Sequence, residues 1–207
     1  MNRLIKVVLL STLGLLGVTT AMATEEAKYT VVKRQDAFEL RDYAPHILAE
    51  TVVDGRLEDA SNKAFNRLFR YISGNSESRN KVAMTAPVSQ SPSPEKIAMT
   101  APVGQRSVGD KWAVSFMMPA SSTMATLPKP NDASVILREV PARRMAAVRY
   151  SGRWSEANYK QHKLELEAWI RKNGFTIIGD PAWARYDPPY MPWFMRRNEI
   201  LIPVEGK

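Results

Sequence analysis

Alternating apolar and polar positions predict two strands and a helix in the first part of the chain. Residues 38–41 alternate as a half-buried strand does, and Pro45 separates them from a second strand over residues 47–53. Gly55 then opens a turn into a helix over residues 58–73. Apolar residues at three- and four-residue spacing predict that one face of this helix packs on the sheet. These residues are Phe65, Leu68, Phe69 and Ile72.

The same order of elements is predicted in the second part of the chain. Residues 135–140 and 145–150 are typical of strands, and Ser155 is placed to cap a helix that runs to Asn173, with Gly174 after it. The apolar face of this helix carries Tyr159, Leu166, Trp169 and Ile170. Further strands are expected near residues 175–178, 183–186 and 199–204.

An internal repeat accounts for this similarity. At a fixed offset of 97, residues 38–60 align with residues 135–157, and leucine, arginine, acidic, alanine and glycine positions coincide. Both segments have the order strand, break, strand, glycine turn and helix. The sequence therefore predicts two structural repeats, at about residues 29–119 and 134–204.

A shorter repeat lies between the two halves. Residues 81–88 and 96–103 are nearly identical and flank a stretch rich in Ser and Pro. They predict a hairpin, with a further strand over residues 112–118 and then a loop over residues 119–134. The whole pattern predicts an α+β fold: an antiparallel or mixed sheet curled into a barrel with pseudo-twofold symmetry, on which two amphipathic helices pack.

The first 23 residues have the three zones of a secretory signal peptide. Arg3 and Lys6 give a positive start, residues 7–18 are apolar, and Ala-Met-Ala at residues 21–23 has the small residues of a cleavage site. The apolar run is shorter than the roughly 20 residues that span a bilayer, so we expect cleavage and no stable membrane anchor. The sequence thus predicts an exported single domain over residues 24–207, periplasmic where the cell has an outer membrane.

The composition excludes several kinds of partner, metal ligand and catalytic site. The chain carries 29 Lys and Arg against 21 Asp and Glu, but the two signs are mixed along the sequence, so we expect no nucleic-acid partner. The absence of cysteine excludes a thiolate haem ligand, covalent haem attachment through cysteine and a cysteine zinc site. The sequence has two histidines and lacks the G-x-S-x-G, H-E-x-x-H and phosphate-binding glycine motifs. We therefore expect a non-enzymatic protein with no catalytic residue and no metal site of its own.

The two histidines are the candidates for an axial ligand of haem iron. His162 falls between Leu166 and Trp169 on the apolar face of the second helix. The alternative for His162 is a core or groove histidine bonded to a carbonyl group. His46 follows Pro45 between two strands, a position that is usually exposed.

The first helix carries a more focused pattern. Phe65 and Phe69 lie one turn apart, and Asn62 and Arg70 can reach the edges of the surface that they form. A porphyrin needs this combination, an apolar plate for the ring and amides or cations for its propionates. Packing of the helix on the sheet is the alternative explanation of the same spacing. Near the C-terminus, residues 196–197 are two arginines that either pair with an anionic ligand or flank a strand.

Several segments resemble the SOUL haem-binding protein family, and the resemblance covers nearly all of residues 24–207. The segments are Phe38-Glu-Leu-Arg-Asp-Tyr43, the repeated Ala-Met-Thr-Ala-Pro-Val, and Tyr186-Asp-Pro-Pro189 with Arg196-Arg-Asn-Glu199. The resemblance implies a distorted barrel of about eight strands, built from two β-α-β-β repeats. It also implies that haem or another tetrapyrrole binds in a shallow apolar groove beside the first helix. The groove positions on this chain are Asn62, Phe65, Phe69, Arg70 and Met191.

Two residues depart from the family pattern. Asp42 stands where one relative has a histidine that has been suggested as an axial ligand, and Met191 replaces a lysine that could pair with a propionate. We therefore expect haem or porphyrin as a bound ligand without coordination through that position.

The function predicted from these features is storage, transport or sensing of a tetrapyrrole. One alternative is an enzyme that acts on a tetrapyrrole or a lipid-like substrate in the same groove. Another is an envelope interaction domain that binds a peptide or an amphiphile. The oligomeric state is open, and we expect a monomer.

Overall fold

The structure, a computed structural model, describes residues 24–77 and 96–206. The predicted signal peptide and the first strand of the predicted hairpin lie outside these residues, so both stay predictions. The helices are α1 (Leu57–Ile72), α2 (Glu156–Lys172) and the 3₁₀ helix η1 (Trp193–Met195). The strands are β1 (Glu25–Glu26), β2 (Tyr29–Gln35), β3 (Phe38–Tyr43), β4 (His46–Val53), β5 (Ser76–Glu77), β6 (Thr100–Ala101), β7 (Val103–Val108), β8 (Lys111–Met117), β9 (Lys129–Pro130), β10 (Val135–Val140), β11 (Arg143–Tyr150), β12 (Thr176–Ile177), β13 (Ala182–Arg185) and β14 (Asn198–Glu205).

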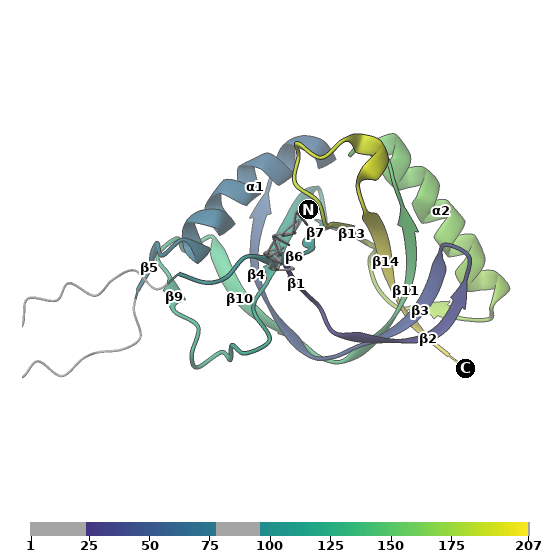
Figure 1. Ribbon diagram of the computed structural model, residues 1–207, viewed down its shortest axis with the longest axis horizontal. Helices are drawn as coiled ribbons and strands as arrows, with labels where there is room; N and C mark the ends of the chain where they lie inside the picture. The colour runs from purple at the N-terminus through teal and green to yellow at the C-terminus, as the bar shows by residue number, and fades with distance from the viewer. Residues whose placement is uncertain (1–23, 78–95, 207) are drawn as a thin grey trace, which may run out of the picture.

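One curved antiparallel sheet dominates the molecule. Its strands follow the order β10-β4-β8-β7-β13-β14-β11-β3-β2, with β12 beside β14, while β1–β6 and β5–β9 form two small sheets. The sheet curls strongly, and α1 and α2 lie on its outer side (Figure 1). The strong curl agrees with a sheet on which two helices pack, whereas the prediction of a distorted barrel of about eight strands is not confirmed. In the described ranges the sheet has ten strands and is open, because the edge strands β10 and β2 each pair with one neighbour and not with each other.

The two halves of the chain occupy corresponding places in the strand order of the sheet. β4 leads into α1 and lies between β10 and β8, whereas β11 leads into α2 and lies between β3 and β14. Each of these strands therefore pairs with a strand from the other half of the chain, β4 with β10 and β11 with β3. Two repeats that exchange neighbours would give this order, but the duplication itself stays a prediction.

Helix α2 forms as its sequence pattern predicts. The Ser155 side chain accepts a hydrogen bond from the backbone N–H of Asn158 and so caps the helix. All four predicted apolar residues are buried, and they pack with the residues of β11, β13 and β14 in one core cluster. Those four are Tyr159, Leu166, Trp169 and Ile170.

Helix α1 packs through a different stripe from the one predicted. Leu68 and Ile72 are buried, but Phe65 is 37% exposed and Phe69 is 44% exposed. The buried stripe starts instead with the small residues Ala60 and Ala64, which let the helix approach the sheet closely. Phe65 and Phe69 each follow a buried position by one residue, so they are turned by about 100° toward the outside. The two phenylalanines are therefore available to a ligand.

Membrane crossing by a helix has no support here. In residues 24–77 and 96–206, no helix combines the length and the apolar character that a membrane span requires.

Candidate ligand-binding cavity beside helix α1

A cavity of about 600 Å³ lies between α1 and the segment that joins β13 to β14. This size falls within the range of roughly 300–1,000 Å³ that is usual for small-molecule sites. Its lining is mostly apolar, with a few polar groups and one buried cation. The lining residues are Thr24, Ser61, Asn62, Phe65, Asn66, Met99, Thr100, Ala101, Val103, Trp154, Arg185, Tyr186, Asp187, Pro188, Pro189 and Tyr190.

The aromatic wall of the cavity comes from α1. The Phe65 ring contacts the buried Phe116 of β8 edge-on, at 5.3 Å between centroids, and it stacks on Phe69 at 5.8 Å. The contact with Phe116 fixes the position of Phe65, while the stack extends the aromatic surface along the outside of the helix. Of the predicted groove residues, Asn62 and Phe65 line the cavity, whereas Phe69 is not among the lining residues and contacts the site through its stack on Phe65.

Arg185 forms part of the cavity wall and is 7% exposed. Its Nη2 donates hydrogen bonds to the Ser61 hydroxyl and, at 2.7 Å, to Gln105 Oε1. Its guanidinium lies 5.2 Å from the Trp154 ring centroid and 4.8 Å from that of Trp183. Burial lowers the pKa of Arg185 to about 10, so it remains a cation at neutral pH.

Arg185 is not among the predicted site residues, although the chain contains a signal for it. Residues two apart in a strand share a face, and Trp183 precedes Arg185 by two positions in the predicted strand over residues 183–186. Trp183 is fully buried. An arginine on the face of a buried tryptophan is a candidate for a buried cation.

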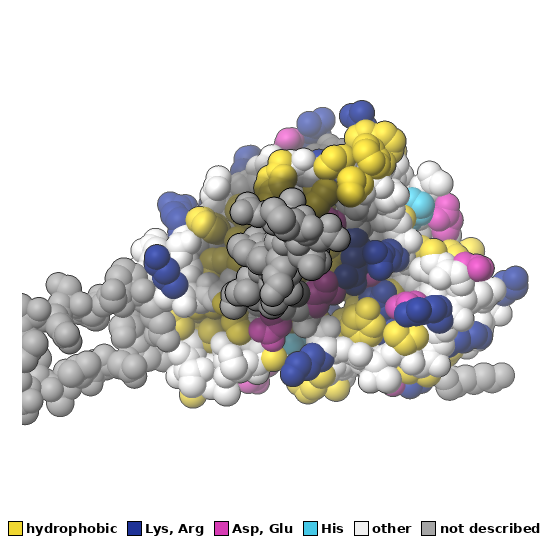
Figure 2. Space-filling view, viewed as in Figure 1, with side chains coloured by type: hydrophobic (Ala, Val, Ile, Leu, Met, Phe, Trp, Pro, Cys, Tyr) yellow, Lys and Arg dark blue, Asp and Glu magenta, His cyan; other side chains and the backbone are white. Residues whose placement is uncertain are grey.

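The opposite wall is the proline-rich segment after β13. Arg196 holds this segment, because its Nε donates to the Met191 carbonyl at 2.8 Å and its Nη2 to the Pro189 carbonyl at 2.6 Å. The guanidinium also lies 4.3 Å from the Trp154 ring centroid. Arg196 therefore orders the wall, and its donors are directed at the backbone. In Figure 2 hydrophobic side chains gather over η1, where Trp193, Phe194 and Met195 are exposed.

Like Phe69, the predicted groove residues Arg70 and Met191 do not line the cavity. Arg70 is exposed on the last turn of α1, and its Nε bonds to the Asn66 carbonyl at 3.3 Å. Met191 is half-buried in the proline-rich segment, where its backbone N–H donates to the Pro188 carbonyl. Neither residue is among those that line the cavity.

Arg197 belongs to an ion-pair network next to this wall. Its guanidinium pairs with Glu26 at 2.9 Å and with Glu199 at 3.0 Å, and Glu199 also pairs with Arg41 at 2.6 Å. Burial alone would raise the pKa of Glu199, but its hydrogen bond and ion pair with Arg41 outweigh burial and hold the pKa below its ordinary value. Tyr186 donates a further hydrogen bond to Glu199 at 2.9 Å. Arg197 is thus paired within the protein.

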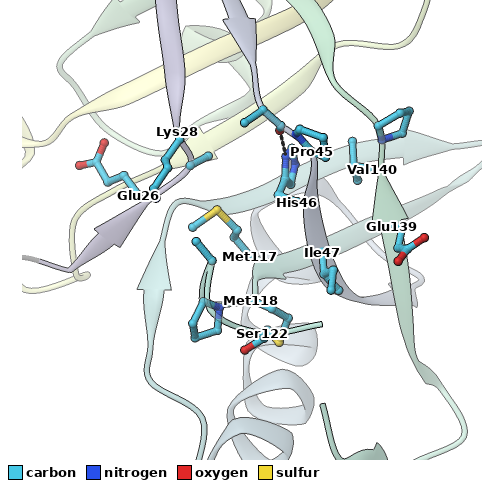
Figure 3. A pocket seen from close by; sticks show the side chains of 15 residues that line it. Glu26, Lys28, Pro45, His46, Ile47, Met117, Met118, Ser122, Glu139 and Val140 are labelled. Atoms are coloured by element: carbon cyan, nitrogen blue, oxygen red, sulfur yellow. Dashed lines mark hydrogen bonds between the residues drawn. The ribbon is translucent and has the colours of Figure 1, made fainter. Parts of the chain in front are cut away.

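His46 lines a second cavity, of about 480 Å³, together with Met117 and Met118 (Figure 3). It is half-buried as the first residue of β4, so the expectation of an exposed position is wrong. Its Nδ1 lies 3.0 Å from the Ala44 carbonyl and is therefore the protonated nitrogen of the neutral ring. Burial lowers the pKa of His46, which keeps the imidazole neutral at pH 7. Its Nε2 is left with a lone pair, as an iron ligand requires.

His162 is placed as a structural residue. It stacks on Tyr150 at 4.0 Å between ring centroids, and its Nδ1 lies 2.7 Å from the Glu165 carboxylate. Its side chain is 22% exposed, and it is not among the residues that line either cavity. Its partner is a carboxylate and not the predicted carbonyl group. Among all residues that the structure describes, no group of three or more His, Cys, Asp and Glu could hold a metal ion.

The structure is thus an α+β domain with a mostly apolar cavity between a helix and a proline-rich segment. A model of the SOUL heme-binding protein family matches residues 24–203. The chain belongs to this family, which confirms the resemblance found in the sequence.

Relatives of similar sequence agree with this assignment, and a solved structure shares the fold. Heme-binding protein 1 of Mus musculus is 28% identical over 152 residues, covering 73% of this chain and 75% of the relative. Heme-binding protein 1 of Xenopus tropicalis is 26% identical over 165 residues, covering 79% and 82%. The crystal structure of a hydrolase from Listeria innocua matches with a TM-score of 0.57 at 13% identity, covering 84% of this chain and 94% of the other. That likeness shows the fold alone.

Proposed function

We propose that this protein binds haem or another tetrapyrrole non-covalently in the cavity beside α1. The observation that carries the proposal is the cavity itself, which holds about 600 Å³ and is lined mainly by aromatic and aliphatic side chains. A few polar groups in an apolar site are the usual means of orienting a flat hydrophobic ligand. The relatives Heme-binding protein 1 of mouse and frog support the choice of ligand class.

Phe65 supplies the contact surface for the ring in this proposal. Its exposed ring faces the cavity, and Met99 and Val103 lie on the lining with it. Asn62 provides an amide at the edge of the site, and Phe69 extends the surface for any part of the ring that projects beyond the cavity. Because Arg70 and Met191 lie outside the lining, we assign them no direct contact.

Iron coordination is not required for binding in this proposal. The described lining residues include no histidine, and Met99, Tyr186 and Tyr190 are its side chains of types that ligate haem iron in other proteins. Ring contacts therefore supply the affinity. We expect metal-free protoporphyrin to bind about as tightly as hemin.

The experiment is a titration of the purified protein with hemin and, separately, with protoporphyrin, followed by the Soret band and by tryptophan quenching. Trp154 lies on the lining, so its fluorescence reports occupancy of the cavity. We expect saturable binding of both ligands. Replacing Phe65 and Phe69 together by alanine should weaken binding at least 10-fold, whereas Phe194→Ala, which removes an exposed phenylalanine of η1, should not.

Two results would contradict this assignment. Unchanged affinity in the double variant would remove the cavity beside α1 as the site. Binding of hemin but not protoporphyrin, with a ligand-field spectrum that His46→Ala abolishes, would place the ligand in the second cavity instead.

We also propose that the protein stores, carries or senses the tetrapyrrole outside the cytoplasm, after removal of residues 1–23. The support is the three-zone pattern of the leader. Cell fractionation with N-terminal sequencing tests this, and a mature chain that starts at Thr24 is expected. Retention of Met1 on protein recovered from the cytoplasm would contradict it.

A further inference from the structure

Arg185 is a buried cation that has no carboxylate partner among residues 24–77 and 96–206. It is 7% exposed, and none of the ion pairs in the described ranges includes it. Its Nε is buried and has no hydrogen-bond partner in that part of the chain. An unpaired buried charge is costly, and a buried donor that is left unsatisfied adds to the cost. A bound anion would therefore supply the negative charge and the hydrogen-bond acceptor that Arg185 lacks here.

The neighbours of Arg185 orient the guanidinium without neutralising it. Ser61 and Gln105 accept hydrogen bonds from Nη2, and these two side chains also bond to each other at 2.6 Å. The rings of Trp154 and Trp183 flank the group. These contacts restrain the group, so the orientation is set in advance of binding.

The remaining charged group on the cavity wall does not cancel the charge. Asp187 lines the same cavity, but its carboxylate accepts the backbone N–H of Arg197 and lies beyond ion-pair distance of Arg185. The cavity therefore combines an apolar aromatic wall with a positive group of fixed orientation. An amphipathic anion, with a carboxylate attached to a flat apolar body, matches that combination.

We infer that Arg185 binds a carboxylate of the ligand in the cavity beside α1. The inference rests on the proposed function, and it adds the orientation of the ligand: a tetrapyrrole enters with one propionate directed at Arg185 and its ring against Phe65. Tetrapyrroles that lack acidic side chains are excluded from tight binding. Arg185 thus determines specificity, whereas Phe65 supplies the apolar contact.

The test compares protoporphyrin with its dimethyl ester, which keeps the ring but has no carboxylate. In the unaltered protein we expect the free acid to bind about 10- to 100-fold more tightly than the ester, the range expected for a hydrogen-bonded charge pair. Arg185→Met should weaken binding of the acid by a similar factor and leave binding of the ester within about 2-fold, because the lost contact is the charged one. Arg70→Met, which removes an exposed arginine of α1, should keep the full preference for the acid.

The outcomes separate this inference from the proposed function. Equal affinity for acid and ester in the unaltered protein overturns the role of Arg185 and leaves tetrapyrrole binding standing. Binding of neither compound overturns both. An Arg185→Met protein that retains the preference for the acid also overturns the inference. Circular dichroism verifies the fold of the variant, and the comparison in the unaltered protein does not depend on it.

Discussion

Two arginines are almost equally withdrawn from solvent but lie in opposite electrostatic surroundings. Arg41 is 2% exposed and Arg185 is 7% exposed. Arg41 places Nη1 2.6 Å from the Glu199 carboxylate and Nε 2.6 Å from that of Glu39. Arg185 instead donates to a serine hydroxyl and a glutamine oxygen, both of them neutral.

The pKa values of the two guanidinium groups shift in opposite directions. For Arg41, burial alone would lower the pKa, but the hydrogen bond and the charge of Glu199 outweigh it and raise the pKa. For Arg185, burial dominates and lowers the pKa to about 10. Arg41 therefore forms an ion pair that links β3 to β14. In our inference, Arg185 forms its ion pair only when a ligand carboxylate binds.

Removing Arg41 should have the largest effect on stability. Arg41→Met leaves the fully buried Glu199 with Arg197 as its remaining ion partner. Breaking a buried pair costs about 3–5 kcal/mol, and we expect the low end, about 3 kcal/mol, because Arg197 remains. Urea unfolding measures this loss. Arg144→Met, which breaks the partly exposed pair with Asp42, should cost less than about 1 kcal/mol. Equal losses in the two variants would contradict a stabilising role of the buried pair between Arg41 and Glu199.

The pH dependence of stability tests the same network from its acidic side. The folded-state pKa of Glu199 is lowered, so its contribution to stability is present above the ordinary value of about 4.5 and is lost as the pH falls through the folded value. We therefore expect the free energy of unfolding to fall less steeply below pH 4.5 in Glu199→Gln than in the unaltered protein. Parallel curves for the two proteins would contradict the pairing. Asp42→Asn is the matched control, because Asp42 is a partly exposed carboxylate whose pKa the Arg144 hydrogen bond lowers.

Much of the fold could be predicted from the sequence because its signals are local. Helix α2 has an N-cap, an apolar stripe and a terminal glycine in the right order, and the structure places it at Glu156–Lys172. The strand predicted over residues 135–140 is β10 with the same bounds. Closure of the sheet is different, because it depends on whether β2 and β10 meet. No local pattern determines a pairing between strands that far apart in the chain.

The candidate site was predictable only in part, for the same reason. The spacing of Phe65 and Phe69 identified the helix but not which side of it faces outward, because that depends on how closely Ala60 and Ala64 approach the sheet. The role of Arg185 depends on Ser61 and Gln105, which are distant in the sequence. Periodicity detects amphipathic faces, whereas a missing counter-ion is visible only when all neighbours are known.

Ser61 gives a smaller effect, confined to the cavity. Its hydroxyl accepts from Arg185 and donates to Gln105, so Ser61→Ala removes one of the two anchors of the guanidinium. We expect affinity for protoporphyrin to fall about 3- to 10-fold, the size of one hydrogen bond, while affinity for the dimethyl ester stays unchanged. The ratio of the two affinities is the readout. Ser107→Ala, at an exposed serine of β7, is the control and should leave the ratio unaltered. An unaltered ratio in Ser61→Ala would show that Ser61 does not contribute to binding of the carboxylate.

The smallest expected change is in the stability of ligand-free Arg185→Met. The substitution removes a buried charge that no described carboxylate pairs with, so it leaves no described carboxylate buried without a partner. Ser61 and Gln105 keep their mutual hydrogen bond, and a flexible methionine can fill the space between Trp154 and Trp183. We expect the free energy of unfolding in urea to stay within about 1 kcal/mol of the unaltered protein.

A loss of about 3 kcal/mol in Arg185→Met, equal to that expected for Arg41→Met, would make Arg185 a structural residue and end the contrast between the two arginines. A near-zero change in the free energy of unfolding, together with weaker binding of the free acid, would assign Arg185 to ligand binding. An arginine that can be replaced by methionine without loss of stability does not contribute to the stability of the fold. Its position would then be explained by the carboxylate that it binds.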